Sequence, residues 1–377
     1  MSFYQFLAGP DLESTDYGQR YVAADRRAFL KWAAGLGLAV PALHGLASAA
    51  AAQESGGHDE HTEGLEGTPE VGSGYVGSDP ESPSTGDASP VPAGEPVFTW
   101  YDPYLPRVEP GEKEITIVTT DVVQLIAKDV PFAGWTFDGT IPGRPLRMVE
   151  GDTVHFTYRI DPAASTSHSV DFHSAKTLPE QSYKTIAPGE EFSWSFPARV
   201  PGAYMYHCGT PPVLLHIGAG MYGAMIVDPK EGWSPAQELI FVQSDFYLVK
   251  DEATGFMVPD YRKMLGHGTM DYVTFNGHAS QYVDRPIRVR VGEPIRIFVV
   301  NAGPNVWSSF HVVGGIFDRA YVNANPHNLL QGLQSISIGP GDGACVELTL
   351  EEPGLYPAVN HAFGHAAHGA IALLQAE

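Results

Sequence analysis

The residues with the clearest chemical meaning lie in one short segment that contains a cysteine, two histidines and a methionine. His207 and Cys208 are adjacent, and His216 follows Cys208 after seven intervening residues. Met221 follows after four more. One thiolate, two imidazoles and a weakly bound thioether form the soft ligand set that suits blue copper, and the upstream His168 supplies the second imidazole. We therefore predict a copper site formed by His168, Cys208, His216 and Met221.

The alternation of side chains along a strand predicts a second site beside the first. Adjacent residues of a strand point to opposite faces, so if Cys208 faces the interior of its domain, His207 faces outward. In the segment 168–173, the separations of Asp171 and His173 from His168 are odd, and their own separation is even. His168 then turns inward, while Asp171 and His173 turn outward together. The outward set is two imidazoles with an acid beside them.

A copper ion that binds a substrate needs three protein ligands and one open position. The third ligand of the outward set must come from elsewhere in the chain. His361 follows a strand-like segment that repeats the one before His207, and His311 lies in another apolar run. From spacing alone both remain candidates. Cys345 lies in an alternating strand pattern and is predicted to be a buried apolar residue.

The elements that must position these residues are predicted to be strands. From residue 98 onward, short runs of Val, Ile, Phe and Tyr alternate with Gly, Pro, Asp and Asn, which indicates an all-β fold. The pattern repeats, because Thr136-Phe137-Asp138-Gly139 recurs as Thr274-Phe275-Asn276-Gly277. Pro-Gly pairs stand 13 residues apart in both halves. We predict two homologous Greek-key β-sandwiches, 98–230 and 236–377.

The first hundred residues are predicted to lie outside these domains. Arg26 and Arg27 precede a weakly apolar run and small residues such as Ala47-Ser48-Ala49, which is typical of a twin-arginine export signal over 1–52. Residues 53–97 are rich in Gly, Ser, Pro and Glu and are predicted to be a disordered acidic linker. We therefore expect an exported protein on the periplasmic or extracytoplasmic side. The apolar run is just long enough to remain in the membrane uncleaved, which would tether the protein.

Composition excludes some classes of function. The 377 residues include 44 Asp and Glu against 22 Lys and Arg, a formal charge of −22. Such a surface repels phosphate, so nucleic acid is a poor partner. Ten of the acids lie in residues 53–98, yet the rest of the chain is acidic too. This excess motivates the hypothesis of a halophilic source, against the alternative of an ordinary acidic protein with an acidic linker. Two cysteines exclude a disulfide scaffold.

Taken together, these motifs resemble the copper-containing nitrite reductases over roughly residues 100–377. The resemblance rests on the H-x2-D-x-H segment that begins at His168, on the His207-Cys208 pair, and on the spacing to His216 and Met221. The histidine of the Phe310-His311-Val312-Val313-Gly314 segment and the later His361 complete it. The family has two tandem cupredoxin domains, one type 1 and one type 2 copper per chain, and head-to-tail homotrimers. The resemblance implies the same for this chain.

The resemblance also implies a role for each residue. His168, Cys208, His216 and Met221 would bind type 1 copper, and His173, His207 and His361 would bind type 2 copper. Asp171 and His311 would handle protons, and Val313 would lie over the substrate pocket. The implied reaction is the one-electron reduction of nitrite to nitric oxide. Electrons would come from a small blue-copper protein or a cytochrome c and pass from type 1 to type 2 copper through Cys208 and His207.

Two other functions share parts of this pattern. A two-domain laccase-type multicopper oxidase needs paired H-x-H motifs, and this sequence contains none. An exported blue-copper electron carrier needs only the type 1 ligands and leaves the outward histidines unexplained. Metal content separates the three, with two coppers per chain for the reductase, four for the oxidase and one for the carrier. The remaining histidines considered are predicted to be ordinary surface or core residues: His267, His278, His327, His365 and His368.

Overall fold

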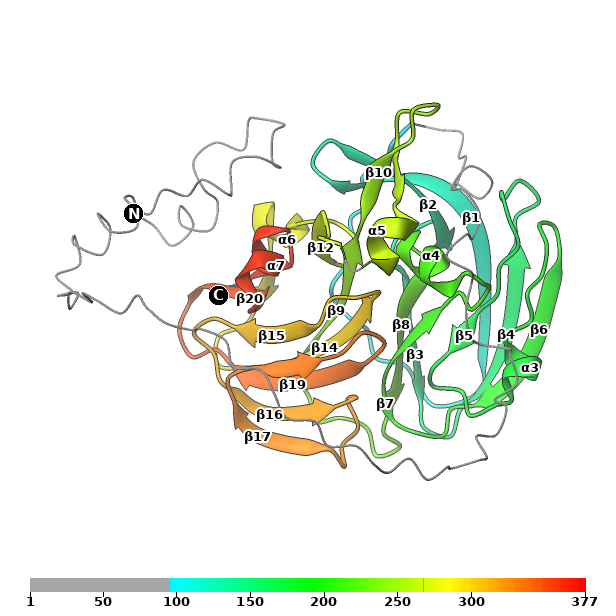
Figure 1. The fold of residues 1–377 in the computed structure, drawn as a ribbon. Coiled ribbons are helices and arrows are strands. Elements are labelled where there is room, and N and C mark those ends of the chain that lie inside the picture. The colour runs from blue at the N-terminus through cyan, green and yellow to red at the C-terminus, as the bar shows by residue number, and fades with distance from the viewer. Residues whose placement is uncertain (1–94, 267) are drawn as a thin grey trace, which may run out of the picture. The chain divides into compact units, whose positions relative to one another are not determined.

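The computed structural model describes residues 95–266 and 268–377, and these lie in the unit Gly77–Glu377. The predicted signal segment 1–52 lies outside the described residues, as does the predicted linker 53–97 up to residue 94. Val97 forms a bridge with Gln124, so the chain joins the β structure at the end of that linker. Among the described residues, the helices are too short or too polar to cross a bilayer. Strands dominate the fold, as predicted (Figure 1).

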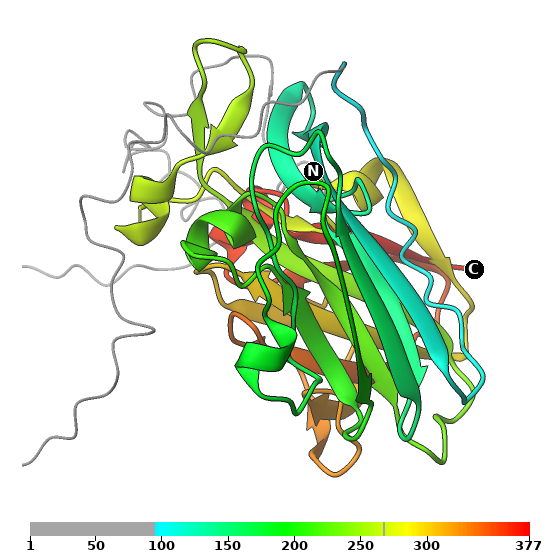
Figure 2. The same cartoon turned by 90° about the vertical axis from the view of Figure 1, so that its right-hand side faces the viewer.

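The first sandwich consists of two sheets with the strand orders β10-β11-β2-β1-β4-β6 and β3-β8-β7-β5. Strands β1 and β4 pair in parallel, as do β3 and β8, and β7 lies between β8 and β5. Figure 2 shows the cyan and green strands of this sandwich lying alongside one another. The strands encoded in the first half of the described chain are β1 (Lys113–Ala127), β2 (Val130–Phe137), β3 (Gly143–Val149), β4 (Thr153–Ile160), β5 (Asp171–Phe172), β6 (Glu191–Pro197), β7 (Gly202–His207) and β8 (Tyr222–Asp228).

The second sandwich repeats this plan with the sheets β12-β9-β14-β19-β16-β17 and β13-β21-β20-β15-β18. Strands β9 and β14 pair in parallel as β1 and β4 do, and β13 and β21 as β3 and β8 do. The remaining strands are β9 (Gln237–Phe246), β10 (Leu248–Lys250), β11 (Met257–Pro259), β12 (Tyr272–Phe275), β13 (Arg285–Val289), β14 (Pro294–Gly303), β15 (Ser308–Val312), β16 (Phe317–Val322), β17 (Leu329–Leu333), β18 (Ile336–Ile338), β19 (Gly343–Thr349), β20 (Gly354–Asn360) and β21 (Ile371–Ala376).

The repeated Thr-Phe-Asp/Asn-Gly segments form the same turn in both sandwiches. Asp138 and Asn276 both have φ of 58°, and the glycine that follows each also has a positive φ. Aspartate and asparagine tolerate this left-handed conformation better than most residues, which explains why the motif recurs with only that exchange. The repeat inferred from sequence therefore corresponds to a structural repeat.

One hairpin crosses the division expected from sequence. Strands β10 and β11 lie within the predicted second domain, yet β11 pairs with β2 of the first sandwich. Helix α5 follows this hairpin and packs on α4 of the first sandwich. The helices among the described residues are all short: α3 (Pro179–Ser182), α4 (Val213–Gly218), α5 (Tyr261–Leu265), α6 (Gln281–Asp284) and α7 (Phe363–Ala367).

A third apolar cluster joins the two sandwiches, in addition to one core within each. Met205 and Ile226 of the first sandwich belong to this cluster together with Phe298 and Val300 of the second. Cys345 is buried here as well, as predicted, while its strand neighbours Ala344 and Val346 face the core of the second sandwich. Gly343 permits a close approach of the two sandwiches here, because a Cβ at this position would lie 2.2 Å from the Ala203 carbonyl oxygen.

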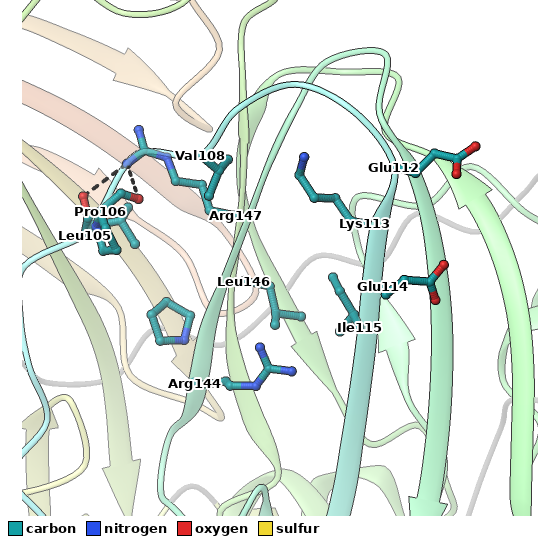
Figure 3. A pocket seen from close by; sticks show the side chains of 11 residues that line it. Leu105, Pro106, Val108, Glu112, Lys113, Glu114, Ile115, Arg144, Leu146 and Arg147 are labelled. Carbon is teal, nitrogen blue, oxygen red and sulfur yellow. Dashed lines mark hydrogen bonds between the residues drawn. The ribbon is translucent and has the colours of Figure 1, made fainter.

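Beside this cluster, four buried charged residues from both sandwiches form one ionic network. Arg147 contacts Asp228 and Glu238 at 2.8 Å, and Glu238 also accepts a hydrogen bond of 2.6 Å from Arg296. The two guanidinium groups lower the pKa of the Glu238 carboxyl despite its burial. Arg147 also donates to the carbonyls of Leu105 and Pro106 at the edge of a surface pocket (Figure 3). No residue of the predicted copper sites lines that pocket.

Candidate metal centres

The structure brings three of the predicted type 1 residues together inside the first sandwich. The Nδ1 atoms of His168 and His216 lie 3.0 Å apart. The Cys208 Sγ lies 3.3 Å from the Nδ1 of His216 and 3.9 Å from that of His168. All three side chains are buried. We call this group the sulfur centre.

Local structure explains how the sulfur centre forms. Cys208 directly follows β7, and His216 lies on α4, which begins after Pro211-Pro212. The Cys208 amide donates to the Met221 carbonyl at 3.1 Å, and the Met221 amide donates to the His216 carbonyl at 3.2 Å. These bonds close the loop from Cys208 to Met221 at the end of the sandwich. The buried Met221 is thereby held beside the centre, in the core cluster that also contains Cys208.

The donor atoms of the sulfur centre fit a soft metal ion. Burial lowers the pKa of His168 to about 3 and that of His216 to about 4, so both imidazoles are neutral. Burial also raises the pKa of the Cys208 thiol, although amide hydrogens of Ser169 and Thr210 oppose that rise. A thiolate in this position therefore needs a nearby cation. The two neutral ring nitrogens that face each other at 3.0 Å can share one hydrogen bond, or both can direct lone pairs at a common metal ion.

A second group of donor atoms lies on the other side of the Cys208 backbone. The Nε2 atoms of His173 and His207 lie 3.0 Å apart. The Asp171 Oδ2 lies 3.4 Å from the Nε2 of His207 and 3.8 Å from that of His173. Asp171 is opposite His207 in the β5 and β7 pair, while Phe172 between Asp171 and His173 faces the core. We call this group the imidazole centre.

In both histidines of the imidazole centre, the other ring nitrogen, Nδ1, is hydrogen-bonded to a backbone carbonyl. The Nδ1 of His207 donates to the Cys208 carbonyl at 2.8 Å, and the Nδ1 of His173 donates to the Gly341 carbonyl at 3.2 Å. With hydrogens on Nδ1, both Nε2 atoms present lone pairs toward each other. Burial, and secondarily His207, lower the pKa of His173. Two lone pairs and a carboxylate oxygen that converge in this way fit a divalent cation.

The other residues predicted for this site lie elsewhere in the chain. The rings of His311 and His361 pack against each other with centroids 5.3 Å apart, and His361 also contacts Phe363. The Nδ1 of His311 donates to the Gln334 carbonyl, and the His361 amide donates to the Ser309 carbonyl. Among the described residues of one chain, neither imidazole joins the group formed by Asp171, His173 and His207. Val313 follows β15 and is half-buried.

Two residues that the sequence analysis did not single out contact these centres. Trp135 is fully buried, and its ring packs on both His168 and His216, at centroid distances of 5.2 and 4.6 Å. Gly341, in the second sandwich, provides the carbonyl for His173 and has φ of 83°, which favours glycine. Trp135 lies next to the repeated Thr-Phe-Asp-Gly motif, but no sequence signal connected either residue with a metal.

The histidines predicted to be ordinary residues do not form further metal groups within the described part of the chain. His365 and His368 lie on or directly after α7, and His365 contacts the Asn360 amide. His278 packs against Phe98, and His327 is at the surface. His267 lies outside the described residues.

Comparison with known proteins identifies the relatives of this chain. Residues 119–232 match a family model described as multicopper oxidase. A copper-containing nitrite reductase of Neisseria meningitidis serogroup B is 38% identical over 299 residues, which covers 76% of each chain. This chain belongs to the copper-containing nitrite reductase family. The solved copper nitrite reductase of Nitrosomonas europaea is 36% identical with a TM-score of 0.66, and the match covers 71% of this chain and 94% of that one.

A more distant match shows how far the fold extends beyond the nitrite reductase family. A solved structure described as a multicopper oxidase is 27% identical with a TM-score of 0.62, over 71% of this chain and 89% of that one. The all-β fold with two tandem cupredoxin sandwiches is therefore shared with oxidases, whereas the higher identities are to nitrite reductases. Copper as the cofactor follows from this family membership and from the two donor groups.

The buried histidines of the sulfur centre should make the metal-free protein sensitive to acid. Their folded pKa values lie below the unfolded value of about 6.5, so the unfolded state binds more protons as the pH falls below that value. We expect the urea midpoint of the metal-free protein to be lower at pH 5 than at pH 7.5, with a smaller decrease in His216→Gln. Burial raises the pKa of Asp245 to about 6, which acts in the opposite direction but equally in both proteins. An equal decrease in both would contradict the prediction.

Proposed function

We propose that this chain reduces nitrite to nitric oxide in a copper-dependent, one-electron reaction, NO2− + e− + 2H+ → NO + H2O. The observation that carries this proposal is the pair of donor groups on opposite sides of one peptide bond. Cys208 belongs to the sulfur centre, and its neighbour His207 belongs to the imidazole centre. An electron carrier would need only the first group. Family membership supports the same reaction, because the relatives are copper-containing nitrite reductases.

Each centre has its own proposed ligands. His168, Cys208, His216 and Met221 would bind type 1 copper, and His173, His207 and His361 would bind type 2 copper. Bound copper would supply a one-electron redox centre at the sulfur and a positive charge with an open coordination position for nitrite at the imidazoles. The peptide between Cys208 and His207 is the covalent connection between the centres, and we infer that the electron follows it.

The protons of the reaction are assigned to Asp171 and His311. The Asp171 carboxylate is buried and lies 3.4 Å from the Nε2 of His207, so it faces the position where nitrite would bind. A carboxyl group and an imidazole that face the same bound nitrite could deliver protons to the oxygen that leaves. Val313, two residues after His311, would bound the pocket with its aliphatic side chain.

The residues of the proposed type 2 site are divided between two faces of the chain, which favours completion of the site by a second subunit. Asp171, His173 and His207 form one face, and His311 with His361 forms the other. In a head-to-tail ring, one face of each subunit meets the other face of its neighbour. We propose a homotrimer of this kind, as the family resemblance implies, with three shared type 2 sites.

Mixing two inactive variants tests the shared site. His207→Ala damages one face and His361→Ala damages the other, so each variant alone should show little nitrite reduction. In trimers refolded from an equal mixture, three quarters contain both chains, and one site in three of these is intact. We therefore expect recovery of about a quarter of wild-type activity in a ring of three.

The outcomes of the mixing experiment are distinct. A site completed within one chain would give no recovery, because neither variant would then contain a complete set of ligands. The matched control mixes His173→Ala with His207→Ala, which damage the same face. That mixture should remain inactive in either case.

The destination of the protein and its electron donor are proposed from sequence alone. We propose export by the twin-arginine pathway to the periplasmic or extracytoplasmic side, which cell fractionation and sequencing of the mature N-terminus would test. A donor such as a small blue-copper protein or a cytochrome c would reduce the sulfur centre. The halophilic origin is proposed from the acid excess, and nitrite turnover measured from low to molar salt would test it, since loss of activity at high salt would oppose it.

Nitric oxide production provides the direct test of the reaction. Purified, copper-loaded protein is supplied anaerobically with nitrite and an artificial reductant, and nitric oxide is measured. We expect nitric oxide and two coppers per chain. Four coppers per chain with oxygen consumption would instead support a laccase-type oxidase, and one copper without turnover would support an electron carrier.

A further inference from the structure

Three fully buried side-chain amides connect the two faces of the proposed type 2 site within one chain. Gln243, Asn301 and Asn360 lie on β9, β14 and β20 of the second sandwich, and each is 0% exposed. Asn360 Nδ2 lies 3.1 Å from Gln243 Oε1, and Gln243 Nε2 lies 3.3 Å from Asn301 Oδ1. A buried amide without hydrogen-bond partners is costly, so a chain of satisfied amides fixes the strands that carry them.

At one end, Asn360 organises the segment that carries His361. Its Oδ1 accepts hydrogen bonds from the amides of Ser309 and Ala362, at 3.1 and 3.2 Å. Its Nδ2 donates to the Trp307 carbonyl at 2.9 Å. Asn360 thus connects the residues on both sides of His361 with β15, the strand of His311. The backbone segments that carry the two histidines of this face are therefore joined by one side chain.

At the other end, Asn301 organises the turn that contacts His173. The Gly341 backbone amide donates to the Asn301 backbone carbonyl at 2.7 Å, and the Asn301 backbone amide donates to the Asp342 backbone carbonyl at 2.9 Å. Asn301 Nδ2 also donates to the carbonyls of Val306 and Ile338. The turn held in this way presents the Gly341 carbonyl that accepts from His173 Nδ1 at 3.2 Å.

We propose that Gln243, Asn301 and Asn360 form a positioning relay that keeps His173 on one face and His361 with His311 on the other at a fixed separation. In the proposed ring the two faces of one chain belong to two different copper sites. The relay therefore connects neighbouring type 2 sites through the interior of each subunit. This inference rests on the proposed function for the identity of those sites. The relay residues touch neither nitrite nor copper, and they act through the histidines that they orient.

The variant that tests the relay is Gln243→Met. Methionine has nearly the same shape but removes both central hydrogen bonds. Because partners beyond the ligands themselves change metal affinity by roughly 10- to 100-fold, we expect type 2 copper to be lost at about tenfold lower chelator concentration than in the wild type. Type 1 copper, measured by its blue absorbance, should be retained, since the sulfur centre lies in the first sandwich. Gln243→Glu keeps the acceptor for Asn360 but cannot donate to Asn301 when ionised, and it should act in the same direction.

Two controls separate positioning from loss of stability. Ser308 lies on the same strand as His311, and its buried hydroxyl has no hydrogen-bond partner. Ser308→Ala should therefore retain type 2 copper. Val346→Ala opens a cavity in the apolar core of the same sandwich. The type 2 copper retained by Gln243→Met is compared with that retained by Val346→Ala, each measured the same number of degrees below its own melting temperature. The relay is wrong if Gln243→Met and Val346→Ala lose copper equally, or if both Gln243 variants retain it as the wild type does.

The measured quantity keeps this proposal separate from the proposed reaction. Copper retained against a chelator, together with the electron paramagnetic resonance signal of type 2 copper, reports on the site without turnover. A wild-type protein that retains both coppers but forms no nitric oxide would refute nitrite reduction. The comparison of the Gln243 variants with their controls would still decide the relay.

Discussion

Cys208→Ser should abolish the blue absorption and lower nitrite reduction by at least about 100-fold. The estimate is a minimum, because loss of a partner beyond the ligands already costs up to about that factor, and here the ligand itself is removed. Cys208 contributes the sulfur of the donor group, at 3.3 Å from the His216 Nδ1, and a serine hydroxyl is a poor ligand for a soft metal ion. Absorbance, copper content and nitric oxide formation are measured on the same preparation.

The matched control is Cys345→Ala, which removes the other cysteine of the chain. Cys345 is equally buried but lies in the apolar cluster between the sandwiches, in the ladder that pairs β19 with β14. We expect this variant to be blue and active. A blue Cys208→Ser protein would show that the sulfur centre is not the type 1 site. A colourless Cys345→Ala protein would show that the blue colour depends on Cys345, against the assignment to Cys208.

Asp171→Asn should retain both coppers and the blue colour, yet lose nitrite reduction by about 10²- to 10⁴-fold, the usual range for general acid catalysis. Asparagine preserves the shape of the side chain but cannot deliver a proton. His311→Ala should have the same signature, because the second proton is assigned to that imidazole. The measurements are turnover across pH, copper content and absorbance.

The same measurements distinguish proton delivery from orientation. If Asp171 only orients His173, from which its Oδ2 is 3.8 Å, the variant should lose type 2 copper together with activity. Loss of activity with both coppers retained supports proton delivery instead. Unchanged turnover in either variant would remove that residue from the mechanism.

Features that depend on neighbours in the sequence could be predicted from it. Cys208 and His216 lie close together in the sequence, so spacing was enough to group them, and strand alternation placed His207 in the other donor group from Cys208. The all-β class and the repeat also followed from local patterns, since the Thr-Phe-Asp-Gly turn forms twice with the same left-handed backbone. Each of these features depends on short-range geometry, which the spacing and periodicity of residues in the sequence indicate.

Features that depend on contacts between distant segments could not be predicted. The Gly341 carbonyl reaches His173 across the two sandwiches, and Trp135 packs on both histidines of the sulfur centre. The hairpin β10–β11 pairs with the first sandwich although its sequence lies within the second. Nothing in a residue's type encodes such a long-range partner. For the same reason, spacing left open whether His361 meets His173 and His207 within one chain.

The buried charges between the sandwiches have a consequence for how nitrite could reach its site. Glu238 contacts Arg147 of the first sandwich and Arg296 of the second, so a hinge between the two halves would have to break the buried Arg147–Glu238 ion pair, which is costly. Opening and closing of the halves is therefore an expensive way to admit a substrate. We therefore expect the chain to admit nitrite without a hinge motion between its two sandwiches.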